Sequence, residues 1–178
     1  MERKPAVFLD RDGVLTEEKS YITSLKELNI FSYARECVRK IHEKGYYAIV
    51  ITNQSGVARG LFTEEQLLEM NRYLTEQTGV DAVYYCPHHP EGKIERYRKI
   101  CSCRKPNTGL LEAANRDFRI DMEHSYLAGD RAGDILAGIY AGLRTILLES
   151  GYGSARLEAQ VRPDYFVQDL RDVIAILQ

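Results

Sequence analysis

The sequence has no apolar run that approaches the roughly 18 residues needed to cross a bilayer. Its first nine residues also lack the apolar core of a signal peptide, so we expect a cytoplasmic protein with no membrane partner. Lysine and arginine (24) nearly balance aspartate and glutamate (26), leaving a formal net charge of −2. This balance provides no overall basic field for nucleic acid and no polybasic membrane anchor.

Internal repeats, low-complexity tracts and linkers rich in proline, glycine or serine are also missing. Nothing in the composition therefore marks a domain boundary within the 178 residues, a length close to the prior of about 150 residues per domain. With 44% hydrophobic and 28% charged residues, the chain has the composition of a globular protein. We expect a single domain over residues 1–178, and a monomer.

Short apolar runs alternate with segments of helical periodicity along the chain. Expected strands cover residues 6–9, 46–52, 80–86, 125–128, 145–148 and 165–167. Expected helices lie near residues 34–41, 63–74, 110–116, 135–141 and 170–177. The alternation predicts the α/β class, with a doubly wound parallel sheet covered by helices on both faces. In such a sheet, polar residues at the carboxyl ends of the strands collect along one edge.

Two carboxylates, Asp10 and Asp12, follow the first expected strand and precede Gly13, which permits a tight turn. Acids at this spacing can share one site. The pKa values of the two acids then separate, so that one acts as nucleophile or metal ligand and the other as acid/base. Ordinary turns and calcium loops use the same residues, so the motif alone leaves those alternatives open.

Other strand ends supply groups that complement these acids. Residues 52–55 offer a hydroxyl, amides and backbone N–H groups suited to a phosphate, although a plain turn would also use them. Arg104 and Lys105 end an irregular stretch, and Asp130 follows another apolar strand. A magnesium ion held by aspartates, with a lysine and a threonine on the phosphate oxygens, is what in-line phosphoryl transfer requires.

In this order, the residues resemble the four motifs of the haloacid dehalogenase (HAD) superfamily: Asp10-x-Asp12, Thr52, Lys105 and Gly129-Asp130-x-x-x-Asp134. The resemblance implies a phosphohydrolase with a Rossmann-like core. It implies that Asp10 forms an aspartyl-phosphate, and that Asp12 protonates the leaving oxygen and then activates water. Thr52 and Lys105 would hold the phosphoryl group.

The same resemblance implies a magnesium cofactor. The ion would be bound by the side chains of Asp10 and Asp130 and by the main-chain carbonyl of Asp12, with Asp134 in support.

The motif spacing leaves no room for a folded cap domain. One helix and turns separate Asp12 from Thr52, and one helix, one strand and an irregular stretch separate Thr52 from Lys105. We therefore expect a capless, open site whose wall is built by the irregular stretch, residues 87–108. A loop of this length without secondary structure needs a further interaction to keep it ordered.

Three of the four cysteines lie at this stretch. Cys86-x-His88 and Cys101-x-Cys103 are two ligand pairs with a 12-residue spacer, which supplies three thiolates and one imidazole for a tetrahedral site. Zinc fits such a set, and four protein ligands would make it structural, so we expect a zinc loop at about residues 86–105. His89 is the alternative imidazole, and three buried or free thiols are the alternative to a metal.

The spacer is rich in lysine and arginine and contains Tyr97, a combination that can contact nucleic acid. In a chain of net negative charge, this local cluster instead favours a phosphorylated small molecule as partner, with no nucleic acid bound.

Within the HAD superfamily, the zinc loop resembles that of the D-glycero-D-manno-heptose-1,7-bisphosphate 7-phosphatases and that of the histidinol-phosphate phosphatases. Residues 8–14 (FLDRDGV), 52–59 (TNQSGVAR), 84–90 (YYCPHHP) and 101–106 (CSCRKP) are similar to the heptose enzymes, and the spacer length also fits them. This resemblance implies removal of the 7-phosphate of a sugar bisphosphate. It implies substrate contacts from Arg11, Glu18, Tyr21, Asn53, Gln54, Ser55 and Arg104.

The heptose family usually has asparagine where this chain has Thr16, and residues 17–20 also depart from its common pattern. The alternatives are a histidinol-phosphate phosphatase, another sugar-phosphate phosphatase, and a zinc-stabilised binding module without catalysis. The intact pair Asp10 and Asp12 speaks against the last.

Overall fold

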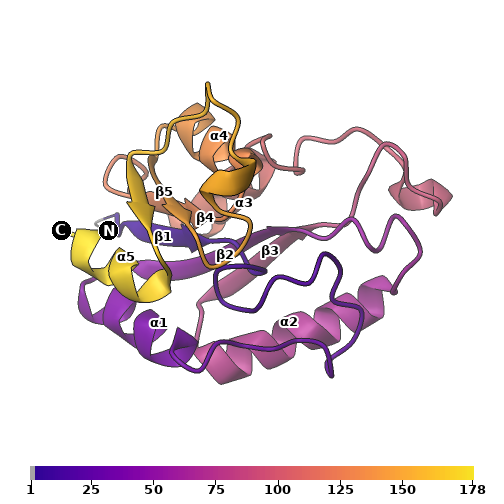
Figure 1. Ribbon diagram of the computed structural model, residues 1–178, viewed down its shortest axis with the longest axis horizontal. Helices are drawn as coiled ribbons and strands as arrows, with labels where there is room; N and C mark the ends of the chain where they lie inside the picture. Colours follow the sequence, from indigo (N-terminus) through magenta and orange to yellow (C-terminus); the bar gives the residue numbers. More distant parts are fainter. Residues whose placement is uncertain (1–2) are drawn as a thin grey trace.

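The computed structural model describes residues 3–178 as six strands and five α-helices that alternate along the chain (Figure 1). The strands are β1 (Ala6–Leu9), β2 (Tyr47–Asn53), β3 (Ala82–Cys86), β4 (Tyr126–Gly129), β5 (Arg144–Leu148) and β6 (Tyr165–Val167). The helices are α1 (Ala34–Glu43), α2 (Glu64–Thr78), α3 (Gly109–Phe118), α4 (Ala132–Tyr140) and α5 (Leu170–Ile176).

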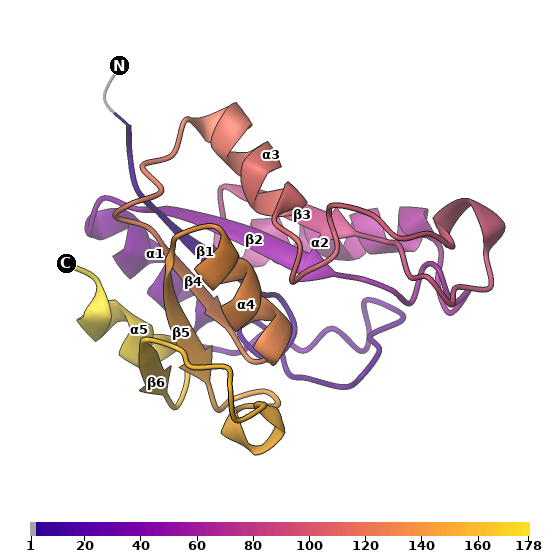
Figure 2. The ribbon, with the colours of Figure 1, turned by 90° about the horizontal axis from the view of Figure 1, so that it is seen from above.

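All six strands form one parallel sheet in the order β3-β2-β1-β4-β5-β6. The chain builds one half of the sheet with β2 and β3, and then returns to the other side of β1 for β4 to β6. Figure 2 shows α3 and α4 on one face of the sheet, and α1, α2 and α5 on the other. The predicted α/β class with a doubly wound parallel sheet is confirmed. A ligand crevice is expected at the carboxyl ends of β1 and β4, where the strand order reverses.

Alternate side chains of β1 enter the two layers of the core. Val7 and Leu9 pack in the cluster that contains α1 and α5, whereas Ala6 and Phe8 pack with residues of α3 and α4. All four side chains are fully buried. Burial on both faces explains why the strand is a continuous apolar run. It also fixes the end of β1, which Asp10 directly follows.

Several element boundaries differ from the predicted ones, and the starts of α4 and β3 have identifiable local causes. Helix α4 begins at Ala132 instead of residue 135, because the Asp134 carboxylate accepts the Arg131 N–H at 3.1 Å and satisfies a donor of the first turn. Strand β3 begins at Ala82 instead of residue 80. Helix α2 continues to Thr78, and Gly79 then ends it in the left-handed conformation, with φ of +81°.

The two intervals between the motifs contain no separate folded unit in the part of the chain that the structure describes. Residues 13–51 hold an irregular segment, α1 and most of β2, whereas residues 54–104 hold α2, β3 and the stretch that begins at Pro87. Among residues 3–178, no helix is long and apolar enough to cross a membrane.

Candidate active site

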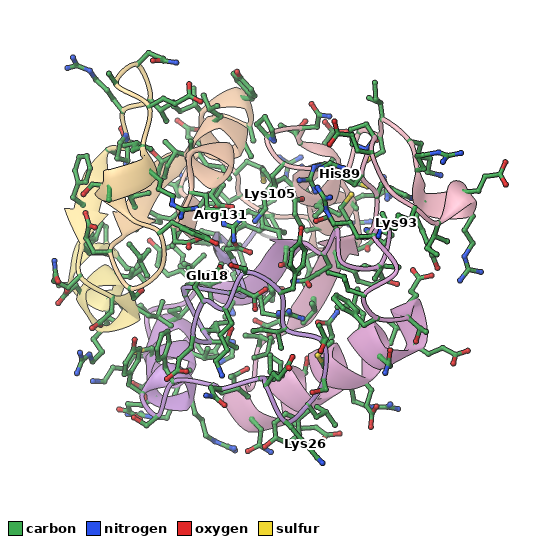
Figure 3. All side chains as sticks on the ribbon, turned by 45° about the vertical axis from the view of Figure 1, so that its right-hand side comes forward. Glu18, Lys26, His89, Lys93, Lys105 and Arg131 are labelled. Atoms are coloured by element: carbon green, nitrogen blue, oxygen red, sulfur yellow. The ribbon has the colours of Figure 1, made fainter. Side chains whose placement is uncertain are left out.

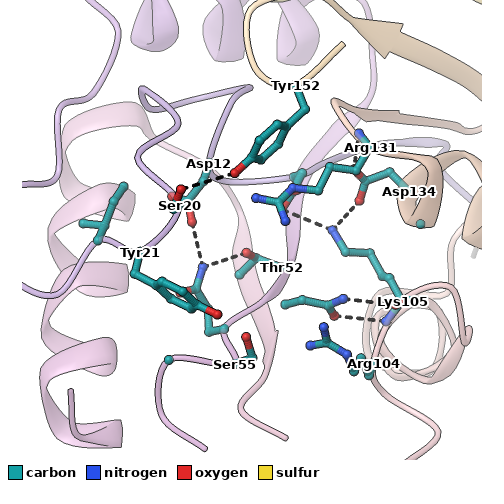
Figure 4. Close-up of a pocket in the computed structure, with 16 residues that line it drawn as sticks. Asp12, Ser20, Tyr21, Thr52, Ser55, Arg104, Lys105, Arg131, Asp134 and Tyr152 are labelled. Atoms are coloured by element: carbon teal, nitrogen blue, oxygen red, sulfur yellow. Dashed lines mark hydrogen bonds and ion pairs between the residues drawn. The ribbon is translucent and has the colours of Figure 1, made fainter. Parts of the chain in front are cut away.

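A cavity of 460 Å³ opens at the carboxyl ends of the central strands (Figure 4). The structure brings the four predicted catalytic residues, Asp10, Asp12, Thr52 and Lys105, together on its wall. Most of the predicted substrate contacts line the same cavity: Tyr21, Asn53, Gln54, Ser55 and Arg104. Residues from distant parts of the sequence meet here because parallel strands place their carboxyl ends at one edge.

Asp10 follows β1 and is nearly buried. Its Oδ1 accepts the Arg11 backbone N–H at 2.8 Å and lies 3.1 Å from Lys105 Nζ. Both contacts use Oδ1, which leaves Oδ2 available for a phosphorus atom or a metal. Burial raises the pKa of Asp10 to about 6 despite Lys105, and the nearby Asp134 and Asp12 carboxylates act in the same direction as burial.

Lys105 is the buried cation of the site. Its Nζ lies 2.6 Å from Asp134 Oδ1 and donates to the Ile51 carbonyl at 2.8 Å. Burial lowers the pKa of Lys105, but Asp10 and Asp134 outweigh this effect and raise it, so the amine carries a charge at neutral pH. The Asn53 side chain fixes the backbone of Lys105, accepting its N–H at 3.0 Å and donating to its carbonyl at 3.1 Å.

Asp12 is held by three side chains, two from the segment after β1 and one from the segment after β2. Arg11 donates to both of its carboxylate oxygens at 2.8 and 3.0 Å, Thr16 Oγ1 donates at 3.0 Å, and Gln54 Nε2 donates at 3.0 Å. Burial raises the pKa of Asp12, but Arg11, Gln54 and Thr16 together lower it. Gln54 Nε2 also donates to Thr52 Oγ1 at 2.9 Å, so one amide links the two motifs.

Arg11 is placed differently from the substrate contact predicted for it. Its side chain is fully buried and does not line the cavity. The guanidinium points at Asp12 and at Asn71 Oδ1, 3.3 Å away, because residue 11 faces the interior where Asp10 and Asp12 face the cavity. The prediction of a substrate contact is therefore corrected to a role in holding Asp12.

Three buried carboxylates form a candidate metal site. Oxygens of Asp10, Asp130 and Asp134 all lie within 4.8 Å of one another. Asp130 Oδ2 accepts the Tyr152 N–H at 2.8 Å, whereas its buried Oδ1 has no hydrogen-bond partner among the described residues. Burial, together with Asp10 and Asp134, raises the pKa of Asp130 to about 8. An unused buried oxygen and an excess of carboxylates over cations fit a hard divalent ion such as magnesium.

The cysteine and histidine residues form a second cluster at the end of β3. The three sulfur atoms of Cys86, Cys101 and Cys103 lie 3.0 to 3.5 Å apart, and His88 Nδ1 lies 3.3 Å from Cys103 Sγ. Four ligands around zinc would be about 3.7 Å apart, so the donor set and its spacing fit this ion. Hydrogen bonds from Cys86, then from Cys101 and His88, lower the pKa of Cys103, whereas the same contact with Cys103 raises the pKa of Cys86, so one thiolate is shared within the cluster.

The structure places His88, not His89, in this cluster. His89 Nε2 instead lies 3.2 Å from Arg59 Nη2, and its Nδ1 accepts the Glu91 N–H at 3.1 Å.

The zinc loop is also attached at a place that was not predicted. The Ile94 N–H donates to the Ala58 carbonyl at 2.9 Å, and Tyr97 and Tyr85 both donate their hydroxyls to the Glu64 carboxylate. Glu64 opens α2, so this contact joins the loop to the segment after β2. The sequence contains no periodic signal for it, because the pairing is long-range and polar.

Arg131 and Tyr152 are among the cavity residues that were not predicted. Arg131 Nη2 pairs with Glu18 Oε2 at 2.9 Å, so the predicted substrate contact Glu18 reaches the cavity through Arg131. Figure 3 shows Glu18, Arg131 and Lys105 in one region of the molecule, with Lys26 far from them. The sequence did offer one signal for Arg131 and Tyr152, because both follow the end of a strand. Arg131 follows Asp130 after β4, and Tyr152 lies in the turn after β5.

The chain is similar to known phosphatases over nearly its whole length. A family model described as HAD-hydrolase-like matches residues 102–173. The D-glycero-beta-D-manno-heptose-1,7-bisphosphate 7-phosphatase of Haemophilus ducreyi is 37% identical, with 96% of this chain and 97% of that protein covered. The protein of the same name from Escherichia coli K12 is 34% identical, with 95% and 91% covered. A crystal structure of D,D-heptose 1,7-bisphosphate phosphatase from B. bronchiseptica, complexed with magnesium and phosphate, has a TM-score of 0.82 at 29% identity and 97% coverage of both chains.

Proposed function

The chain belongs to the family of the D-glycero-β-D-manno-heptose-1,7-bisphosphate 7-phosphatases, and we propose that it hydrolyses the 7-phosphate of such a heptose bisphosphate with magnesium as cofactor. One observation carries the proposal. The same cavity holds Asp10, Asp12 and Lys105, which suit one phosphoryl group, and two guanidinium groups, Arg104 and Arg131, which suit a second phosphate.

In the first step, Asp10 Oδ2 attacks the phosphorus and forms an aspartyl-phosphate while the bond to the sugar oxygen breaks. Asp12 gives its proton to that leaving oxygen. The hydrogen bonds from Arg11, Thr16 and Gln54 keep the Asp12 carboxyl directed at the cavity. An incoming phosphate dianion counteracts their effect on the pKa of Asp12, because a neighbouring negative charge favours the protonated acid.

In the second step, the Asp12 carboxylate takes a proton from water, whose oxygen attacks the phosphorus and releases Asp10. Lys105 neutralises charge on the phosphoryl oxygens and on Asp10, and Thr52 Oγ1 offers a further donor. A magnesium ion, when bound by Asp10 and Asp130 with Asp134 nearby, supplies two positive charges that offset the negative charge of the phosphoryl group.

Selectivity in this proposal comes from segments at the cavity mouth. Arg104 directly follows the zinc ligand Cys103, and its Nη1 donates to the His88 carbonyl at 3.4 Å. Zinc held by Cys86, His88, Cys101 and Cys103 would therefore fix the guanidinium that meets the non-transferred phosphate. We also propose that the chain works as a monomeric, capless single domain in the cytoplasm, where the cysteines stay reduced, without a nucleic-acid partner.

A substrate panel tests the function. We expect kcat/KM to be highest for heptose 1,7-bisphosphate, lower for histidinol phosphate and lowest for 4-nitrophenyl phosphate, all with saturating magnesium. Asp10→Asn keeps the shape of the side chain and should lower every rate by several orders of magnitude with the melting temperature retained. Preference for histidinol phosphate would overturn the heptose assignment, and residual activity of Asp10→Asn above a small fraction would overturn the nucleophile.

A further inference from the structure

Tyr152 lies where three parts of the cavity wall meet. Its backbone N–H donates to Asp130 Oδ2 at 2.8 Å, and its hydroxyl lies 3.4 Å from Ser20 Oγ. The turn that carries it is fixed, because Ser150 Oγ donates to the Gly13 carbonyl at 2.6 Å and a Cβ on Gly151 would lie 2.1 Å from Asp130 Oδ2. The ring therefore projects from a rigid support.

The Tyr152 ring lies between two guanidinium groups. The Cζ atom of Arg131 is 4.2 Å from the ring centroid, and that of Arg156 is 4.3 Å away. A guanidinium on an aromatic face is attracted by the ring quadrupole, while its N–H donors point along its own plane and stay available. Figure 4 shows Arg131 beside Tyr152. Arg131 uses one of these donors on Glu18, so ring and carboxylate both hold it.

Arg131 needs this support because it reaches the cavity from the surface. Its side chain is 49% exposed, and its Nε lies 3.9 Å from Asp130 Oδ1, beyond hydrogen-bond distance. A long, half-exposed side chain loses rotamer freedom when it binds an anion, and this loss weakens binding. A ring that already holds the guanidinium in place reduces that loss.

We propose that Tyr152 is a positioning residue that sets selectivity for bisphosphate substrates by holding the Arg131 guanidinium at the cavity. The inference rests on the proposed function, since it assigns Arg131 to the non-transferred end of the substrate. Glu18 and a substrate anion compete for the same guanidinium, and the ring keeps Arg131 in place when Glu18 releases it. Tyr152 acts through Arg131 and has no part in the transfer of the phosphoryl group.

Three replacements of Tyr152 separate the properties of its side chain. Phenylalanine keeps the aromatic face without the hydroxyl, leucine keeps apolar bulk without the face, and alanine keeps neither. The measurement is kcat and KM for heptose 1,7-bisphosphate and for 4-nitrophenyl phosphate, which has no second phosphate. We expect Tyr152→Leu and Tyr152→Ala to raise KM for the bisphosphate by about three- to tenfold, more than kcat falls, and to reduce the selectivity ratio. Tyr152→Phe should keep the wild-type ratio.

Tyr140→Ala is the matched control, because Tyr140 is an exposed tyrosine on α4 outside this cavity, and it should keep wild-type values. A double-mutant cycle tests whether Tyr152 acts through Arg131. In an Arg131→Ala background, Tyr152→Ala should change KM by less than about twofold, since the ring has no guanidinium left to hold.

Additive effects in this cycle, or a Tyr152→Leu variant equal to wild type, would overturn the inference. Failure of the wild type to hydrolyse heptose 1,7-bisphosphate would overturn the proposed function instead. The same cycle is then measured on another sugar bisphosphate that the wild type hydrolyses, where additivity again rejects the role of Tyr152 and non-additivity supports it.

Discussion

Neighbouring residues of this site have opposite electrostatic environments. Burial raises the pKa of Asp10 despite Lys105, and the nearby carboxylates add to this effect, whereas the half-buried Asp12 lies beside Arg11, which lowers its pKa. The turn after β1 begins as extended chain, in which successive side chains point to opposite sides, and this alternation explains the difference. Residues 10 and 12 face the cavity, and residue 11 faces the interior, where its guanidinium contacts Asp12 and Asn71.

Arg104 and Lys105 are adjacent cations with different predicted roles. Arg104→Ala should lower kcat/KM for the heptose bisphosphate by about one to two orders of magnitude, since a charge-assisted contact contributes roughly 1.5 to 3 kcal/mol. It should change 4-nitrophenyl phosphate hydrolysis much less. Lys105→Ala should slow hydrolysis of both substrates, because Lys105 contacts the nucleophile. Steady-state kinetics on the two substrates measures the contrast.

Arg98→Ala is the control for this pair, because Arg98 is an exposed arginine of the same loop, outside the cavity. An Arg104→Ala variant with an unchanged ratio between the two substrates would contradict the assignment of Arg104 to the second phosphate.

The raised pKa values of Asp10, about 6, and Asp130, about 8, predict how stability depends on pH without metal. Both pKa values lie above the ordinary value of 3.8. Between pH 3.8 and the raised pKa of each acid, the folded state therefore holds more protons than the unfolded chain. The free energy of unfolding should then fall as pH rises from about 4 to 8. Magnesium binds the charged carboxylates, and it should raise the melting temperature most at the upper end of this window.

Thermal melts in a chelator and in magnesium, at about pH 6 and about pH 8, measure this dependence. Asp130→Asn should flatten the metal-free dependence, whereas Glu123→Gln, a change at an exposed acid, should not. A metal-free melting temperature that rises over the same interval would show that these two acids do not carry the linkage.

At the scale of elements, the loop of residues 86–105 is attached to the rest of the fold at two places. The Cys/His cluster joins it to the end of β3, and the Glu64 carboxylate at the start of α2 joins it through the hydroxyl of the buried Tyr97. Hydrogen bonds from Tyr97 and Tyr85 lower the pKa of Glu64, so the acceptor is a carboxylate at neutral pH. The two attachments are far apart in sequence, and each should hold part of the loop when the other is removed.

Glu64→Gln should therefore loosen residues 91–100 while zinc stays bound, because it weakens only the hydrogen bonds from the tyrosines. We expect amide hydrogen exchange in this segment to be about three- to tenfold faster, with roughly one zinc per chain retained. Glu65→Gln, at the neighbouring exposed position of the same helix, is the matched control.

Cys101→Ser should have the converse effect, with loss of zinc and faster exchange near residues 101–104. Zinc absent from carefully reduced wild-type protein would contradict the structural role of the cluster. Unchanged exchange in Glu64→Gln would mean that the contact with Tyr97 does not hold the loop.

At the scale of the whole molecule, one chain supplies every residue of the candidate site. If the chain works as a monomer, as proposed above, specific activity should stay constant over a hundredfold dilution and sedimentation should give a single monomeric species. A loss of specific activity on dilution that returns on concentration would indicate that a second copy contributes to the site.

The sequence by itself determined the parts of this protein that follow from local pattern. Continuous apolar runs such as residues 6–9 that alternate with helical segments are typical of strands buried on both faces of a sheet, so they predict the doubly wound fold. The strand ends then predict that Asp10, Thr52 and Asp130 meet at one edge. The spacing of Cys86, His88, Cys101 and Cys103, two ligand pairs separated by a short spacer, likewise predicts a shared metal site.

Only the tertiary structure decided which way individual side chains point and which distant polar groups pair. Arg11 has the charge of a substrate ligand, yet its place in the turn after β1 buries it against Asp12 and Asn71. The sequence places Tyr152 after a strand end and Glu64 at the start of a helix, but it does not identify their partners, because their roles depend on contacts with Arg131 and Tyr97 across the fold. Periodicity reports the apolar faces that drive folding, whereas a polar contact depends on a single distance and direction, which the assembled backbone alone defines.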